Sequence, residues 1–223
     1  MIKLQNVSKS YQIDDETIFY ALKNTSLEIK EEEFVSIIGP SGSGKSTLMH
    51  LIGLLDKPTK GEVLIQGKKI SHLNDDQISS LRNEFIGFVF QQFNLISKLS
   101  VLENILLPTI YSRKKINYDP HTKAIDLLKK FGLYEKRNSF PNKISGGQQQ
   151  RVAILRALIM EPKLILADEP TGNLDSKTGS EIMHLLKELN EKEKITIAVV
   201  THEADIAAYG KKIIKVRDGG IEK

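Results

Sequence analysis

Two glycine-rich segments of this chain carry residue types that bind phosphate. The first, Gly39-Pro-Ser-Gly-Ser-Gly-Lys-Ser-Thr47, fits the pattern G-x-x-x-x-G-K-[S/T] and follows a short apolar run, Phe34–Ile38. Glycines let successive N–H groups point at an anion, and the start of the following helix adds a favourable dipole. Lys45 would reach the β- and γ-phosphates of a nucleotide, while the Ser46 hydroxyl would ligate Mg²⁺. The predicted phosphate contacts are Gly39, Pro40, Ser41, Gly42, Ser43, Gly44, Lys45, Ser46 and Thr47.

The second segment, Ile144-Ser-Gly-Gly-Gln148, opens a helical run about a hundred residues later. Ser145 is a plausible N-cap, and Gly146 and Gly147 leave backbone N–H groups open to an anion. Taken alone, the segment reads equally well as an ordinary helix start that happens to contain two glycines. With the first segment present, a second anion cradle becomes the more specific interpretation.

Two carboxylates follow an apolar strand in Leu164-Ile-Leu-Ala-Asp-Glu169. Asp168 at the strand's end can hold Mg²⁺ through water, and Glu169 can polarise a water that attacks a phosphoanhydride. Such a pair in isolation is usually a solvated turn or a helix cap. The phosphate loop upstream makes the catalytic interpretation the stronger one.

The remaining pattern predicts an α/β fold. Apolar or alternating runs predict strands at 2–7, 25–29, 34–38, 62–66, 85–90, 163–167 and 195–200, and the first two are expected to pair antiparallel. Apolar spacing predicts helices from Ser46 to Leu55 and across Ile182–Leu189. Residues 93–142 read as a helical insertion with loops at Pro108, Pro120 and Pro141, and the tail reads as a hairpin turning at Asp218-Gly219. Near-continuous apolar strands alternating with helices favour a parallel sheet covered on both sides.

Composition limits the classes of partner. The 223 residues carry a formal charge of +4, but the lysines are scattered without a long basic block, so no nucleic-acid binding is expected. The chain has no cysteine, which excludes disulfide and thiolate chemistry. No apolar run approaches the ~18 residues that span a bilayer, and the N-terminus lacks a signal-peptide core. We therefore expect a soluble chain whose membrane role, if any, comes through a partner.

These segments together resemble the ATP-binding-cassette ATPases, over essentially the whole chain and in the family's order. The loop at 39–47 matches the Walker A motif, Gln91 the Q-loop, 144–148 the signature motif, and 164–169 Walker B. Residues 173–175 resemble the D-loop, His202 the switch histidine, and Tyr11 the aromatic residue that stacks on adenine. The resemblance implies one nucleotide-binding domain over 1–223. Its fold would be a P-loop cassette with a mixed β-sheet core, an N-terminal antiparallel β-subdomain and a helical subdomain inserted at about 93–150.

The resemblance also implies roles for residues. ATP would be hydrolysed at the interface of a head-to-tail homodimer, with Tyr11, the loop, Gln91 and His202 binding it on one chain and Glu169 activating water. Ser145, Gly147 and Gln148 of the other chain would cover its γ-phosphate, and Asp175 would couple the two sites. The implied catalytic residues are Glu169, His202, Gln91 and Lys45, and the implied Mg²⁺ ligands are Ser46, Gln91 and Asp168.

The detailed sequence of these motifs is similar to that of the family branch serving lipoprotein release and macrolide or antimicrobial-peptide export. Members pair with permeases of four transmembrane helices, so the chain is expected on the cytoplasmic face of the membrane, held by a permease near Gln91. Three residues depart from the family pattern: Glu32 where glycine is usual, Ile144 for leucine and Leu155 for alanine. Alternatives are a cell-division ATPase whose membrane partner moves no substrate, a non-transport cassette acting on nucleic acid, and a P-loop kinase or GTPase. The last would leave 144–148 unexplained.

Overall fold

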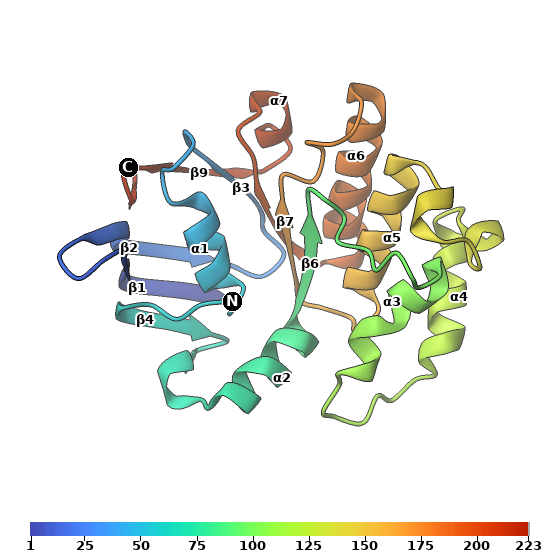
Figure 1. Ribbon diagram of the computed structural model, residues 1–223, viewed down its shortest axis with the longest axis horizontal. Coiled ribbons are helices and arrows are strands. Elements are labelled where there is room, and N and C mark those ends of the chain that lie inside the picture. The colour runs from blue at the N-terminus through green and yellow to red at the C-terminus, as the bar shows by residue number, and fades with distance from the viewer. Residues whose placement is uncertain (223) are drawn as a thin grey trace. The chain divides into compact units, whose positions relative to one another are not determined.

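The computed structural model describes residues 1–222 and divides into two compact units (Figure 1). The first unit contains Met1–Ser79 together with the chain from Thr196 onward, and the second contains Ser80–Ile195. Each unit carries its own strands and helices.

The first unit begins with an antiparallel sheet in the order β2-β1-β4-β5. These strands are Ile18–Ile29, Ile2–Gln12, Lys60–Ile65 and Lys68–Lys69, and the short 3₁₀ helix Ile70–His72 follows. Alternate residues such as Ile2 and Leu4 are buried, as the period-two pattern predicts for a sheet with one covered face. The predicted antiparallel pairing of the first two strands is confirmed, with Leu4 opposite Leu27.

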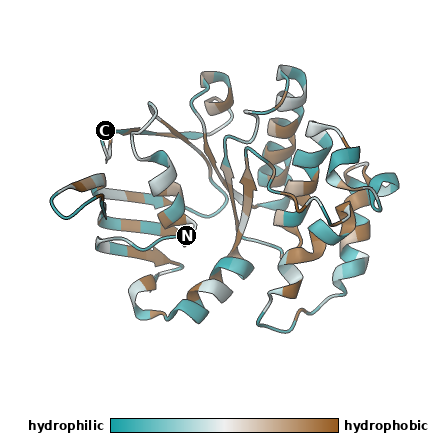
Figure 2. Cartoon of the chain, in the orientation of Figure 1, coloured by the Kyte–Doolittle hydropathy of each residue, from teal (hydrophilic) through white to brown (hydrophobic). Residues whose placement is uncertain are grey.

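The second sheet of this unit supports the phosphate loop. Strand β3 (Phe34–Ile38) pairs in parallel with β8 (Thr196–Val200) on one side and β9 (Lys212–Arg217) on the other, and β10 (Gly220–Ile221) closes a hairpin with β9. Strands β3 and β8 are hydrophobic along almost their whole length, whereas β1 and β2 alternate (Figure 2). That difference reflects burial on both faces, with α1 (Lys45–Ile52) packed on β8 and α7 (Ala204–Ala207) on β3.

The predicted end of the helix after the phosphate loop was wrong. Helix α1 ends at Ile52 rather than Leu55, because Gly53 caps it and Leu54 turns left-handed with φ 55°. Leu55 therefore leaves the apolar face and is 45% exposed.

Helix α2 (Asp75–Phe85) was not predicted, although the sequence carries its start signal. The side chain of Asn74 accepts a hydrogen bond from the Gln77 N–H at 2.8 Å, and the Gln77 side chain accepts from the Asn74 N–H at 2.9 Å. This reciprocal cap, followed by Asp75 and Asp76 in the first turn, is typical of a helix N-terminus. Phe85 closes this helix, so the next strand begins one residue later than predicted.

The second unit has two parallel strands and a set of helices. Strand β6 (Ile86–Phe90) pairs with β7 (Leu164–Asp168) in a register that places Phe90 opposite Asp168. The helices are α3 (Val101–Ile110), α4 (Pro120–Lys130), α5 (Gly146–Leu158) and α6 (Ser176–Glu193), with 3₁₀ turns at Tyr134–Lys136 and Pro141–Lys143. Helix α5 packs on β6, α3 and α6.

The prolines of this unit lie differently from the prediction. Pro108 is inside α3, in its last turn, where its missing N–H removes the hydrogen bond to the Asn104 carbonyl oxygen. Pro120 is the first residue of α4, capped by Asp119, and Pro141 opens a 3₁₀ turn. Proline is common at the first helical position because that N–H has no partner within the helix.

Candidate functional site

The predicted phosphate loop connects the end of β3 to the start of α1. Gly44 is the N-cap of α1, with φ 105° and ψ 6°, and no side chain caps the helix. The first N–H groups of any α-helix have no partner within the helix, so this end of α1 offers donors and a favourable dipole to an anion.

The side chain of Lys45 reaches back across this loop. Its side chain is buried, and Nζ donates to the carbonyl oxygens of Gly39 and Pro40 at 2.8 Å each. The ammonium is therefore held within the loop by backbone carbonyls, where a bound phosphate would meet it. Ser46, the next residue, is exposed.

Two glycines of the loop, Gly39 and Gly44, lie so close to neighbouring backbone that a side chain would not fit at either position. A Cβ on Gly39 would lie 2.1 Å from the Val216 carbonyl oxygen, and one on Gly44 would lie 2.5 Å from that of Ala21. The glycines thus keep the backbone bare and allow its N–H groups to turn toward a ligand. This cradle fits a phosphate group.

Tyr11 is fixed by two charged neighbours. Its hydroxyl donates to Asp56 Oδ2 at 2.9 Å, and Lys9 Nζ lies 4.9 Å from the ring centre while pairing with Asp56 Oδ1 at 2.6 Å. Burial and the Asp56 carboxylate raise the pKa of Tyr11, while a hydrogen bond with Thr47 opposes the shift. The aromatic ring predicted to stack on a base therefore lies beside the last residue of the phosphate loop.

His202 lies just beyond the end of β8. In the parallel pairing Ile37 is opposite Val200, and the Thr201 N–H donates to the Ile37 carbonyl oxygen at 3.1 Å. Strands β3 and β8 therefore end at the same edge of the sheet, which places the phosphate loop and the exposed His202 at that edge. The first unit brings together Tyr11, the loop and His202.

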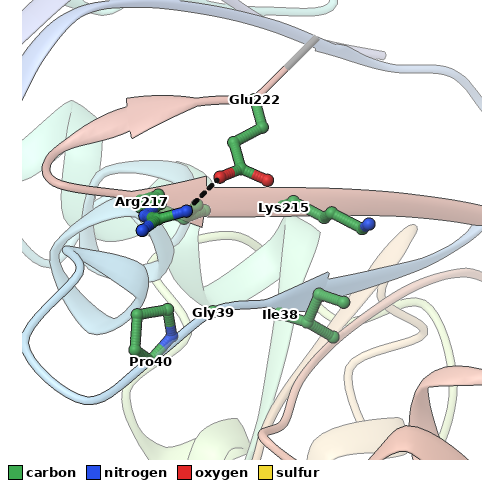
Figure 3. A pocket seen from close by; sticks show the side chains of 7 residues that line it. Ile38, Gly39, Pro40, Lys215, Arg217 and Glu222 are labelled. Atoms are coloured by element: carbon green, nitrogen blue, oxygen red, sulfur yellow. Dashed lines mark ion pairs between the residues drawn. The ribbon is translucent and has the colours of Figure 1, made fainter.

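A pocket of about 370 Å³ lies beside this loop, between Ile38–Pro40 and the strand β9 (Figure 3). The ion pair of Arg217 and Glu222, at 3.5 Å, crosses it. Gly39 and Pro40 of the phosphate loop line this pocket, whereas Lys45 and Ser46 do not.

The second unit gathers the predicted carboxylates and Gln91. Because Phe90 is opposite Asp168, Gln91 and Glu169 leave the ends of neighbouring strands. The Gln91 carbonyl oxygen accepts from Asn173 Nδ2 at 2.9 Å, and a Cβ on Gly172 would lie 2.6 Å from Gln91 Nε2. Glu169 has φ 43°, a left-handed conformation that is uncommon for glutamate and is concentrated at functional sites.

The segment predicted as a second anion cradle is a capped helix start. Ser145 caps α5 by accepting from the Gln148 N–H at 3.3 Å, and the Gln148 side chain accepts from the Ser145 N–H at 3.0 Å. The predicted cap is thus confirmed. A Cβ on Gly147 would lie 2.4 Å from Thr178 Cγ2, so α5 begins in close contact with α6.

Asp175 caps the neighbouring helix α6. Its carboxylate accepts from the Thr178 hydroxyl at 2.6 Å and from the Thr178 N–H at 3.0 Å, and these bonds lower its pKa. Gln150, buried in α5, donates from Nε2 to the Pro170 carbonyl oxygen at 2.6 Å. The signature helix is therefore tied to the chain on either side of the D-loop.

Two polar residues of this unit, the half-buried Arg156 and the buried Asn104, were not predicted. Arg156 donates to the carbonyl oxygens of Phe93 and Asn94 at 2.8 and 2.5 Å, and burial lowers its pKa. Asn104 donates to the carbonyl oxygens of Ile96, Leu99 and Ser100 and accepts from the Ile96 N–H. Both hold the segment that follows Gln91. A polar residue within an otherwise apolar helix pattern was the sequence feature that could have indicated these buried hydrogen bonds.

Comparison with known proteins identifies the family. The family model described as "ABC transporter" matches residues 22–172, about two thirds of the chain. The chain belongs to the ABC transporter family. A relative 54% identical over the whole chain and 96% of its own length is an uncharacterized ABC transporter ATP-binding protein, MJ0796, of Methanocaldococcus jannaschii. Another, 49% identical, is the macrolide export ATP-binding/permease protein MacB of Bdellovibrio bacteriovorus, of which the chain spans only 33%.

A solved structure of a family member has the same fold as this chain. The ATP-binding cassette MJ0796, described as a dimer in a post-hydrolysis state bound to ADP and phosphate, matches the whole chain with a TM-score of 0.90 and 53% identity. The predicted cassette fold, with its antiparallel N-terminal sheet and helical insertion, is confirmed. The chain is an ATP-binding subunit of an ABC transporter and an ATPase.

Proposed function

We propose that two copies of this chain hydrolyse ATP at a shared interface and thereby drive an integral-membrane permease. The observation that carries the proposal is that one chain has two different glycine-rich helix starts, each with the chemistry to bind an anion. The loop before α1 supplies a buried lysine, and the start of α5 supplies two glycines. A family relative whose solved structure is a dimer bound to ADP and phosphate supports the pairing.

We assign the following roles to residues of one chain. Lys45 and the loop N–H groups bind the phosphates, Tyr11 stacks on the base, and Glu169 orients the attacking water. The water oxygen bonds to the γ-phosphorus as the bond to the β–γ bridging oxygen breaks, so the products are ADP and phosphate. His202 contacts the γ-phosphate.

Ser46, Gln91 and Asp168 are the proposed ligands of Mg²⁺. A hydroxyl, an amide and a carboxylate offer the oxygen donors that this ion prefers, and the ion would neutralise charge on the phosphates. The second chain completes the site with Ser145, Gly147 and Gln148. Asp175, the N-cap of α6, couples one site to the other.

The permease is proposed from the relatives. The MacB proteins are named as ATP-binding/permease proteins, and the chain spans about a third of their length. Among residues 1–222, no helix is long and apolar enough to cross a membrane. We propose a separate permease, of four transmembrane helices per subunit, that contacts the segment after Gln91 and exports or extracts its substrate. A cell-division complex that moves no substrate is the alternative.

The assignment of Glu169 is tested by phosphate release. Glu169→Gln should lower kcat by about 10²- to 10⁴-fold, the usual contribution of a general base, while ATP still binds. Glu161→Gln is the matched control, because Glu161 is an exposed glutamate of the same unit whose partner is Lys123. Hydrolysis by Glu169→Gln within threefold of the parent rate would remove Glu169 from the mechanism.

A further inference from the structure

Two aromatic side chains lie opposite each other on the hairpin formed by β1 and β2. Tyr11 on β1 is paired with Phe19 on β2 in the antiparallel register. Directly opposed residues of an antiparallel pair project from the same face of the sheet. Both are open to solvent, Tyr11 at 37% and Phe19 at 49%.

This face of the hairpin looks onto the phosphate loop. Lys9, two residues before Tyr11, is paired with Leu22, and the register shift that follows keeps Phe19 on the same side as Leu22. A Cβ on Gly44 would lie 3.1 Å from Leu22 Cδ2. The buried Leu22 therefore contacts the loop, and Tyr11 and Phe19 continue the same face outward from it.

Tyr11 is held in place on this face, which leaves Phe19 as the open neighbour. The hydroxyl of Tyr11 is bound to Asp56, and Lys9 lies over its ring. A base stacked on Tyr11 would lie on the Tyr11 side of the hairpin, next to Phe19. Phe19 has no polar group, so it can contact a base only through the face or edge of its ring.

We propose that Phe19 is a second base-contacting residue, forming with Tyr11 an aromatic platform for the base of the nucleotide whose phosphates bind the loop. The inference rests on the proposed function, because it takes Tyr11 as the residue that stacks on the base. Neighbouring Tyr20 has similar exposure, 53%, but it is paired with Ser10 and projects from the opposite face.

The test compares three alanine variants in ATP titrations of the full chain. Phe19→Ala should raise KM for ATP about 5- to 30-fold with kcat within twofold, because losing a base–aromatic stack weakens binding by a factor of this order. Tyr11→Ala should do the same. Tyr20→Ala, the matched control, should leave KM unchanged.

Tripolyphosphate as a competitive inhibitor separates base contact from a general structural effect. It carries the phosphates without a base, so its inhibition constant should be the same for Phe19→Ala and the parent chain. A parallel loss of tripolyphosphate binding, an equal effect of Tyr20→Ala, or an unchanged KM for Phe19→Ala would overturn the inference. If Tyr11→Ala also leaves KM unchanged while Lys45→Ala abolishes binding, the base site of the proposed function is wrong.

Discussion

Replacing Gly44 with alanine should destabilise the protein more than the same change at Gly42, although both glycines belong to the phosphate loop. Gly44 has φ 105°, and its new Cβ would meet the Ala21 carbonyl oxygen at 2.5 Å. Left-handed strain costs about 1–2 kcal/mol and overpacking against backbone about 1–3 kcal/mol, while the stiffer unfolded chain offsets about 0.4–1 kcal/mol. The free energy of unfolding should therefore fall by about 1–4 kcal/mol. Gly42 has φ 75° and nothing within 4 Å of the new atom.

Gly42→Ala therefore carries strain alone. The stiffer unfolded chain offsets about 0.4–1 kcal/mol of that strain, so the net loss should be about 1 kcal/mol or less. Urea denaturation of the nucleotide-free protein, followed by circular dichroism, measures both values with one protocol. Equal losses in the two variants, or a loss below 1 kcal/mol for Gly44→Ala, would show that the loop is not packed against β2 as described.

Three further predictions concern residues around the site. Glu32 has φ 61°, so Glu32→Asn should raise the free energy of unfolding by about 0.5–1 kcal/mol, since asparagine tolerates this conformation; a urea titration showing no gain would contradict this. Asn104→Ala should lower it by about 1–3 kcal/mol, because backbone groups of the 96–100 segment lose their hydrogen bonds to the buried Asn104 side chain; a loss below 1 kcal/mol in the same titration would be inconsistent with that network. Burial acts to raise the pKa of Asp56, but hydrogen bonds from Lys9, the Lys57 N–H and Tyr11 outweigh it and lower the pKa. Since the folded pKa is below the unfolded value of about 4, ionised Asp56 stabilises the fold above that pH and this contribution disappears as the pH falls further. Asp56→Asn should therefore lose stability less steeply than the parent between pH 5 and 2, and parallel curves would count against the interaction.

The parts of the fold and site that local sequence determines were predictable. The phosphate loop depends on glycines and a lysine at fixed spacing, and the cap at Ser145 depends on Gln148 three residues later; both formed as expected. Apolar runs mark where strands end, so Gln91 and Asp168 were placed correctly at the carboxyl ends of β6 and β7.

Features that depend on tertiary contacts were not predictable. Pro108 was assigned to a loop because proline disfavours helix interiors, but it lies inside α3, which packs on α5, and its carbonyl oxygen accepts from Asn83 Nδ2 at 3.0 Å. Arg156 reads as an ordinary helical arginine until the fold brings the carbonyls of Phe93 and Asn94 to it. Phe19 likewise gains its interest only from the register that sets it opposite Tyr11.

The central claim, that two chains share each ATP, is tested most directly by the oligomeric state of Glu169→Gln. With hydrolysis blocked, ATP and Mg²⁺ should convert this variant to a dimer on size-exclusion chromatography with light scattering, and the dimer should retain about one ATP per chain. Adding Ser145→Arg, which sets a bulky cation at the start of α5, should return the protein to monomer without abolishing ATP binding. A Glu169→Gln chain that binds ATP and Mg²⁺ yet remains monomeric at every concentration would contradict the shared site.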